Sequence, residues 1–354
     1  MGRFATDPST RIQRFVQKFG NIPYTASGNA PTVDVPKSDY TTYIDIVSNQ
    51  QVVAAGTAPV IAGMGAWGPL GVLTLKTNGN RHPFTMPAYH ADIYNRIRRA
   101  PYTSNLTADP VTISTTNNWT GHLRIPLTCV PDMTVGAFYT GDTSVTLTMQ
   151  AQNYGTAVAF STVNGATIQG SWDLYREIFQ APQPDQPNGW LSDISYYHEV
   201  SIQSTVNLQN GVNKIVMPVN QDYMRILLVF YTGNNFDATF APADGLYTTV
   251  DLVANDKIHL IDTIFEADMR FDMAQSYREV LPAGTCVVDF MRVPNSRRDV
   301  LPTDSPTLTD LNLNINSTSG SNKVDVIIET VVDSPFATKW IASAQALAAG
   351  QKAA

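Results

Sequence analysis

The chain has few charged residues for its length. Of its 354 residues, 15% are charged, against about 25% in a typical soluble domain. A long disordered chain needs high charge and few aromatic residues, so this sequence, which is 43% hydrophobic and 10% aromatic, is expected to fold. Lysine occurs only 8 times, and the formal net charge is −7. Because nucleic-acid-binding domains are usually strongly basic, we expect no direct binding to nucleic acid.

Cysteine and uninterrupted apolar runs are also scarce. The two cysteines, Cys129 and Cys286, are too few for a disulfide framework, which favours synthesis and assembly in a reducing cytoplasm. Glycine and proline interrupt the apolar stretch from 52 to 71, so no clean run long enough for a membrane-spanning helix remains. Residues 1–20 lack the apolar block of a secretory signal.

What the chain has in abundance favours β-structure. It contains 38 threonines, 22 glycines and 22 prolines, residues that suit pleated surfaces and turns. Apolar residues alternate with polar ones in several segments, which predicts strands with one buried face. The segment 225–231 is apolar on both faces and predicts a strand between two layers. The expected strands are 40–47, 70–77, 121–130, 143–150, 156–160, 196–208, 225–231, 257–265, 285–292, 309–316 and 323–332.

Four helices are expected among these strands. In the first, Asp7 and Pro8 suit a helix start, and Ile12, Phe15, Val16 and Phe19 form one apolar stripe. The other three are expected at 88–99, at 270–280 and in the alanine-rich tail at 336–349.

The order of elements repeats along the chain, since a helix, a strand that contains a cysteine, a long loop and two further strands occur in each half. A chain of this length also exceeds the roughly 250–300 residues that one core usually serves. We therefore predict an all-β fold of two tandem β-domains. The expected parts are an amphipathic N-terminal helix at 1–20, a first domain at 21–165, a second domain at 166–335 and a tail at 336–354.

Residue patterns that carry chemistry are weak. Residues 63–68 match G-x-G-x-x-G, but a strand follows instead of the helix that a dinucleotide site needs. His82, His90 and Asp92 are close in sequence, yet their spacing is not that of a zinc motif. A group of acids before the third helix is more typical of a solvated helix start than of a calcium site: Asp262, Glu266, Asp268 and Asp272. We therefore expect no catalytic residues, no cofactor and no metal.

Positive charge gathers at the N-terminus. Arg3, Arg11, Arg14 and Lys18 face a single acid, Asp7, within residues 1–20. A basic amphipathic helix can bind an anionic membrane surface. It can equally pack its apolar stripe against the first domain or a neighbouring subunit, and the sequence leaves both open.

Several segments resemble the double jelly-roll major capsid proteins of tectivirus-type phages with an internal membrane, the lineage of adenovirus hexon. The similar segments are Trp67-Gly68-Pro69-Leu70 before the strand 72–77, Asn80-Arg81-His82 as the following turn, the run 123–128, the loop 132–137, the strand 145–153 and Leu281-Pro282-Ala283-Gly284-Thr285 before Cys286. The resemblance is clearest over 65–165 and 280–335.

This resemblance implies two tandem eight-stranded jelly rolls with short terminal and inter-strand helices. It implies a homotrimeric, pseudo-hexameric capsomer that tiles an icosahedral shell over an internal membrane, located in the virion capsid. The expected partners are further copies of the chain, minor capsid and vertex proteins, and the membrane. In the family the N-terminal helix faces the membrane, which makes Arg3, Arg11, Arg14 and Lys18 the expected membrane-facing residues.

Two alternatives stay open. One is a minor capsid or vertex protein of the same kind of virus. The other is a carbohydrate-binding jelly-roll protein, in which exposed indole rings would stack on sugars: Trp67, Trp119, Trp172 and Trp190.

Overall fold

A computed structural model gives the fold. The residues that it describes are 14–26, 28–37, 40–54, 56–77, 81–98, 116–129, 136–140, 146–179, 196–277, 280–291 and 300–333. The predicted alanine-rich tail lies outside these residues, as does the first part of the predicted N-terminal helix.

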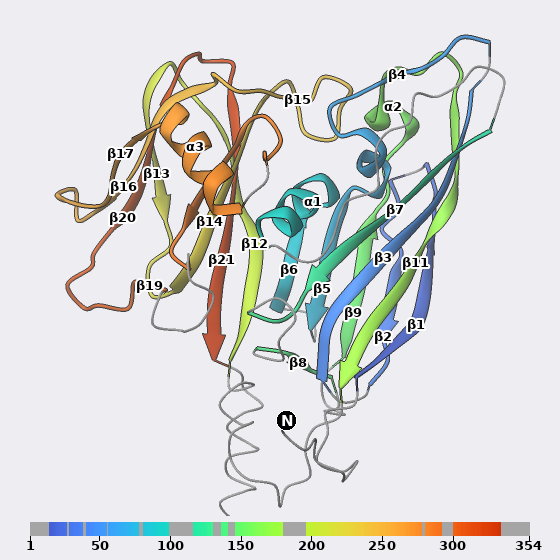
Figure 1. The fold of residues 1–354 in the computed structure, drawn as a ribbon, viewed down its shortest axis with the longest axis horizontal. Helices are drawn as coiled ribbons and strands as arrows, with labels where there is room; N and C mark the ends of the chain where they lie inside the picture. Colours follow the sequence, from blue (N-terminus) through green and yellow to red (C-terminus); the bar gives the residue numbers. More distant parts are fainter. Residues whose placement is uncertain are drawn as a thin grey trace, which may run out of the picture.

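The first half of the chain forms a sandwich of two four-stranded antiparallel sheets (Figure 1). One sheet has the order β1-β11-β3-β7, with the short β8 beside β3. The other has the order β6-β5-β9-β2. Their bounds are β1 Arg14–Pro23, β2 Thr32–Val35, β3 Tyr40–Val53, β5 Val72–Thr77, β6 Arg81–Pro87, β7 Thr116–Pro126, β8 Phe138–Tyr139, β9 Leu147–Gln152 and β11 Thr167–Phe179. We call this sandwich the first roll.

The second half repeats the arrangement, and we call it the second roll. Its sheets have the orders β12-β21-β14-β18 and β13-β20-β16-β17, with the short β15 and β19 beside β14. The bounds are β12 Tyr196–Asn207, β13 Gly211–Met217, β14 Asp222–Thr232, β15 Ala241–Pro242, β16 Tyr247–Ala254, β17 Ile258–Phe265, β18 Thr285–Asp289, β19 Leu301–Pro302, β20 Leu311–Ser317 and β21 Lys323–Asp333. The predicted fold of two eight-stranded rolls is confirmed, because each roll has eight principal strands among the described residues.

Helices are short and connect strands. The described ones are the 3-10 helix η2 (Gly65–Leu70), α1 (Ala88–Ile97), α2 (Thr156–Ala159) and α3 (Glu266–Tyr277). The predicted helices at 88–99 and 270–280 are thereby confirmed in α1 and α3. The predicted strand at 156–160 is wrong, because α2 occupies most of it before the short β10 (Phe160–Thr162), which pairs with β4 (Val60–Ile61). Val158 of α2 lies where a Cβ on Gly68 would be, so the glycine allows α2 to pack closely against η2.

The predicted N-terminal helix is wrong over 14–20, where the chain forms strand β1. β1 pairs with β11 from Arg14↔Phe179 to Pro23↔Ser171. The edge of β11 offers backbone donors and acceptors that need partners, and phenylalanine, valine and isoleucine suit strands as well as helices. The pairing therefore outweighs the helical spacing of the apolar residues.

The predicted division near residue 165 is also displaced by one strand. β11 pairs with β3 over its whole length, from Thr167↔Val53 to Phe179↔Tyr40, so it belongs to the first roll. The pairing therefore puts the division after Phe179 and before Tyr196.

The two rolls share one sheet. Edge strands β6 and β12 pair in parallel at Val200↔Phe84 and Ser201↔Thr85, which joins the inner sheets into a continuous ten-stranded sheet. In Figure 1, α1 lies between the two rolls, whereas α3 lies over the second roll. Strand β14 is buried on both faces, as its apolar run predicted, and Tyr94 and Ile97 of α1 lie beside its residues Arg225 and Leu227.

Candidate functional site

A buried charged seam joins helix α1 of the first roll to strand β21 of the second. His90 Nε2 lies 2.8 Å from Asp325 Oδ2, and Arg98 Nη1 lies 2.7 Å from Glu329 Oε1. Eight residues along a helix advance about 12 Å, and four residues along a strand advance about 13 Å. The helix and the strand therefore run side by side with matched spacing between their paired side chains.

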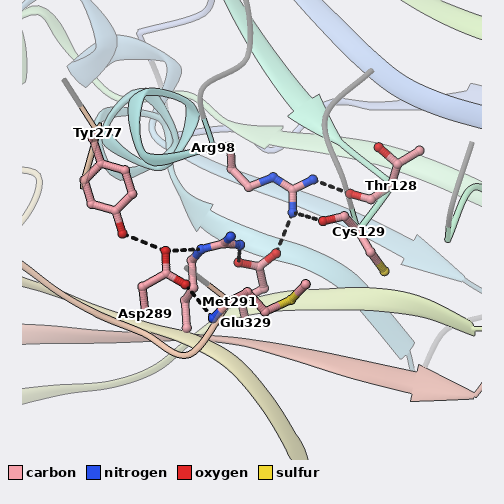
Figure 2. Close-up of polar contacts among 8 residues, drawn as sticks. Arg98, Thr128, Cys129, Tyr277, Asp289, Met291 and Glu329 are labelled. Carbon is pink, nitrogen blue, oxygen red and sulfur yellow. Dashed lines mark hydrogen bonds and ion pairs between the residues drawn. The ribbon is translucent and has the colours of Figure 1, made fainter. Parts of the chain in front are cut away.

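Around Glu329, the charges form a row across three neighbouring strands. Arg225 of β14 stands opposite Glu329 of β21 on one side and Asp289 of β18 on the other. Its guanidinium lies 2.7 Å from Glu329 Oε2 and 3.1 Å from Asp289 Oδ2. Tyr277, the last residue of α3, donates a hydrogen bond to Asp289 (Figure 2). Signs alternate along the row, so each charge has an opposite neighbour.

Arg98 reaches into this row from the end of α1 (Figure 2). It pairs with Glu329 and donates hydrogen bonds to the carbonyl oxygens of Cys129 and Thr128, just beyond β7. Both Arg98 and Glu329 are almost fully buried. Buried charges are tolerated only when they are paired and hydrogen-bonded, and this one guanidinium connects α1, the end of β7 and β21.

Asp325 is held in a similar way. Its two oxygens accept hydrogen bonds from four donors, which are His90, Thr205, Tyr231 and Asn235. A carboxylate has about four acceptor positions, so this one is saturated. Burial alone would raise the pKa of Asp325, but the hydrogen bonds and the charge of His90 outweigh it and lower the pKa below its ordinary value.

Burial and the neighbouring charges also shift the pKa values of Glu329 and His198. Burial would raise the pKa of Glu329, yet the nearby Arg225 and Arg98 lower it to about 2. His198 of β12 is buried beside this row, and burial together with the charge of Arg98 lowers its pKa to about 3. At neutral pH the seam therefore holds an ionised glutamate and a neutral His198. Asp325 and Glu329 contact residues of the first roll, whereas Asp289 contacts Arg225 and Tyr277 within the second roll.

Of the four basic residues predicted to face a membrane, the structure describes two positions. Arg3 and Arg11 lie outside the described residues. Arg14 begins strand β1, and Lys18 lies further along it. Lys18 Nζ lies 2.8 Å from Asp173 of β11 and 5.9 Å from the ring centre of Tyr175. The side chain of Lys18 is half-exposed, but it lies on an edge strand and not on a helix.

The patterns weighed for ligand binding have structural roles. Gly63 packs directly on the backbone of Phe240 in the second roll, and Gly68 packs on Val158, so two of these glycines permit close packing. His90 pairs with Asp325 and not with His82. Glu266 begins α3 and accepts a hydrogen bond from the backbone of Gly245. Among the described residues, no three His, Cys, Asp or Glu side chains are arranged to hold a metal ion.

The tryptophans do not support a sugar-binding surface. Trp67, Trp119 and Trp172 are all buried in the apolar cores of the first roll, and Trp190 lies outside the described residues. Cys129 and Cys286 are both buried, and neither forms a disulfide. None of the described helices is long and apolar enough to cross a membrane.

Sequence reasoning missed the seam, although a signal was present. Asp325 and Glu329 interrupt an otherwise apolar strand four residues apart, which places both on one face. Arg225 begins the strand that is apolar on both faces. A charge within such a strand indicates a buried partner, but nothing in the sequence identifies Arg98 or His90 as that partner.

No protein-family model matches the sequence, and no curated protein sequence matches it. Solved structures are similar over nearly the whole chain. The major capsid protein of Sulfolobus Turreted Icosahedral Virus has a TM-score of 0.69 at 13% identity, covering 90% of this chain and 96% of its own.

Two further structures cover the chain to a similar extent. Major capsid protein P2 of bacteriophage PM2 has a TM-score of 0.59 at 15% identity, covering 91% of this chain and 99% of its own. The PBCV-1 virus capsid chain has a TM-score of 0.62 at 9% identity, covering 93% of this chain and 95% of its own. With both rolls present and joined through one sheet, the fold of this chain is that of the double jelly-roll capsid proteins.

Proposed function

We propose that this chain is the major capsid protein of an icosahedral virus with an internal membrane. The observation that carries the proposal is the likeness of the complete two-roll fold to viral capsid proteins over at least 90% of this chain and 95% of theirs. The chain is not an enzyme in this proposal. Its activity is self-association, first into a homotrimer and then into a lattice with minor capsid and vertex proteins, assembled in the host cytoplasm without direct contact with nucleic acid.

The buried seam supports a structural role. Two of its buried pairs, His90 with Asp325 and Arg98 with Glu329, cross between the two rolls, so the rolls form one rigid building block. A capsomer needs such a block, because each subunit must present fixed surfaces to its neighbours.

The solution mass of the purified protein tests the proposal. Light scattering is expected to give about 116 kDa, three times the chain mass of 38.7 kDa, and the mass should stay constant on dilution. Raising the concentration should then give closed shells or flat lattices under the electron microscope. A chain that stays monomeric and never assembles would contradict the major-capsid proposal. A trimer that needs a second protein to form shells would favour the minor-capsid alternative.

The membrane contact is a separate part of the proposal. It rests on the positive charge of Arg3, Arg11, Arg14 and Lys18 near the N-terminus. Because β1 begins at Arg14, the suitable deletion removes residues 1–13 and leaves the first sheet intact. This deletion is expected to abolish co-sedimentation with anionic vesicles while the melting temperature stays unchanged. An Arg3→Gln and Arg11→Gln double variant should show most of the same loss, and full binding by both variants would exclude the N-terminus as the contact.

A further inference from the structure

Two asparagines in the described part of the chain are followed by glycine. Asn164-Gly165 lies in the turn between β10 and β11, and Asn210-Gly211 lies in the turn between β12 and β13. Two further Asn-Gly pairs, at 78–79 and 188–189, fall outside the described residues. The backbone nitrogen after an asparagine can attack its side-chain amide, and glycine hinders this attack least because it has no Cβ. The two described pairs therefore share the same local chemistry, and only their surroundings differ.

The fold holds the side chain of Asn164. Its Nδ2 donates a hydrogen bond to the carbonyl oxygen of Ala58, 2.7 Å away. The turn around it is also closed, because the nitrogen of Ala166 donates a hydrogen bond to the carbonyl oxygen of Val163 at 2.9 Å. The side chain is only partly exposed. The amide of Asn164 therefore has to give up its hydrogen bond before it can turn toward the nitrogen of Gly165.

Asn210 has the opposite surroundings. Its side chain is exposed and forms no hydrogen bond with any residue that the structure describes. Gly211 has a φ of +95°, and no atom lies within 4 Å of the position that a Cβ on this glycine would take. The amide of Asn210 can therefore rotate toward the nitrogen of Gly211 without breaking a contact.

The backbone on both sides of Asn210 is anchored by another side chain. Asn213 accepts a hydrogen bond from the nitrogen of Gln209 at 2.7 Å. Its Nδ2 donates hydrogen bonds to the carbonyl oxygens of Gln209 and Gly211, each 2.8 Å away. These contacts leave the amide of Asn210 untouched, and they show what a change in the backbone at residue 210 would disturb.

We propose that Asn210 is a site of spontaneous deamidation in the folded protein, whereas Asn164 is protected. The nitrogen of Gly211 attacks Cγ of Asn210, and a new N–Cγ bond forms. The Cγ–Nδ2 bond breaks, and the amide group leaves as ammonia with the proton from the nitrogen of Gly211. Water then opens the succinimide ring at either of its carbonyl carbons, giving aspartate or isoaspartate. One water is consumed and one ammonia is released, so no other reactant is needed.

Both products change the turn. Each adds a negative charge to a chain whose formal net charge is already −7. Isoaspartate also leads the backbone through Cγ, which lengthens the path between Gln209 and Gly211. Because Asn213 bridges these two residues, isoaspartate is expected to break at least one of its hydrogen bonds. The proposal goes beyond the proposed function, since it depends on one turn of a single chain and not on assembly.

Incubation of the purified full-length protein at mildly alkaline pH tests the proposal. Peptide mapping by tandem mass spectrometry at intervals locates each replacement of an amide NH₂ by OH, and labelling with an isoaspartyl methyltransferase detects isoaspartate. In the folded chain, Asn210 should convert about ten times faster than Asn164, because the amide of Asn164 first has to lose a hydrogen bond. In the urea-unfolded chain the two rates should become similar, since glycine follows each asparagine.

Matched variants separate the two positions. Asn210→Gln should remove the conversion at residue 210, because a glutamine side chain would have to close a larger ring and does so much more slowly. Asn164→Gln is the same replacement in the other turn and should leave the rate at Asn210 unchanged. The comparison of folded and unfolded chains needs no variant, so it holds even if one of the substitutions impairs folding.

Two outcomes would contradict the proposal. If Asn210 stays intact in the folded chain while it converts in the unfolded chain, the turn protects Asn210 and the proposal is wrong. If Asn164 and Asn210 convert equally fast in the folded chain, the hydrogen bond to Ala58 gives no protection and the contrast between the two turns is wrong. Neither outcome affects the proposed capsid function, which the solution mass tests separately.

Discussion

Helices α1 and α3 occupy corresponding places in the two rolls, yet their environments differ. Eight of the ten residues of α1 are buried, whereas only Met269, Met273 and Tyr277 are buried among the twelve of α3. The first packs between two rolls of the same chain, and the second covers only its own roll. The comparison teaches that the burial of an element here depends on whether a second roll lies beside it, and not on its position within the roll.

The charged pairs on the corresponding sheets β1-β11-β3-β7 and β12-β21-β14-β18 differ in the same way. Glu329 on β21 is buried between two arginines. The corresponding strand of the first roll, β11, carries Asp173, which pairs with the half-exposed Lys18. Removing one partner of a buried ion pair lowers the stability strongly, whereas an exposed ion pair contributes little to the stability. The same kind of substitution should therefore have unequal effects in the two rolls.

The largest expected effect is that of Glu329→Gln. It leaves Arg98 and Arg225 buried without their shared carboxylate, which should lower the free energy of unfolding by about 3–5 kcal/mol. The urea midpoint measures the loss. Asp173→Asn in the first roll is the matched control and should leave the midpoint almost unchanged. Equal midpoints for the two variants would mean that the seam does not hold the rolls together.

A second test compares the two helices directly. Tyr94 of α1 is 2% exposed, and Tyr94→Ala should cost about 3 kcal/mol of stability through the cavity that it leaves. Phe271→Ala on α3 should cost less than about 0.5 kcal/mol, as an exposed substitution does. Both losses are measured as shifts of the urea midpoint. A large loss for Phe271→Ala would contradict the exposed position of this side chain on α3.

The smallest expected effect is a change in pH dependence. His198 has a pKa of about 3 in the folded chain against 6.5 for the free side chain, so the unfolded chain binds a proton first as the pH falls. Stability should decrease as the pH drops below 6.5. Glu329, with its pKa lowered from 4.5 to about 2, adds a further loss below pH 4.5.

The variant His198→Asn should remove the first part of this loss, making the melting temperature less dependent on pH between 7 and 5. His122→Asn is the control, because His122 lies exposed on β7 and should keep the unsubstituted pH profile. Parallel curves for all three proteins would show that His198 does not titrate on unfolding.

Much of the fold could be predicted from alternation along the chain. The predicted strands at 196–208, 225–231 and 323–332 correspond to β12, β14 and β21, and the two inter-strand helices were expected. The failures share a cause. Residues 14–20 have helical apolar spacing but pair with the edge of β11. Residues 167–179 were not predicted as a strand and were placed in the second domain, because their partner β3 lies more than a hundred residues earlier.

The candidate site was less predictable than the fold. The strand that holds Asp325 and Glu329 was expected, but Arg98 lies 231 residues from Glu329 in sequence. The predicted basic residues gave the sign of charge at the N-terminus, while the structure shows that Lys18 already has a partner in Asp173.

The sequence by itself determined the all-β class, the two similar halves and the strand that is buried on both faces. These are consequences of local spacing and composition, which act within a few residues. Only the tertiary structure decided which strand completes which sheet, that β6 and β12 join the two rolls, and which charges are buried together. Those choices depend on the backbone groups and charges that distant segments leave unpaired, so no local pattern contains them.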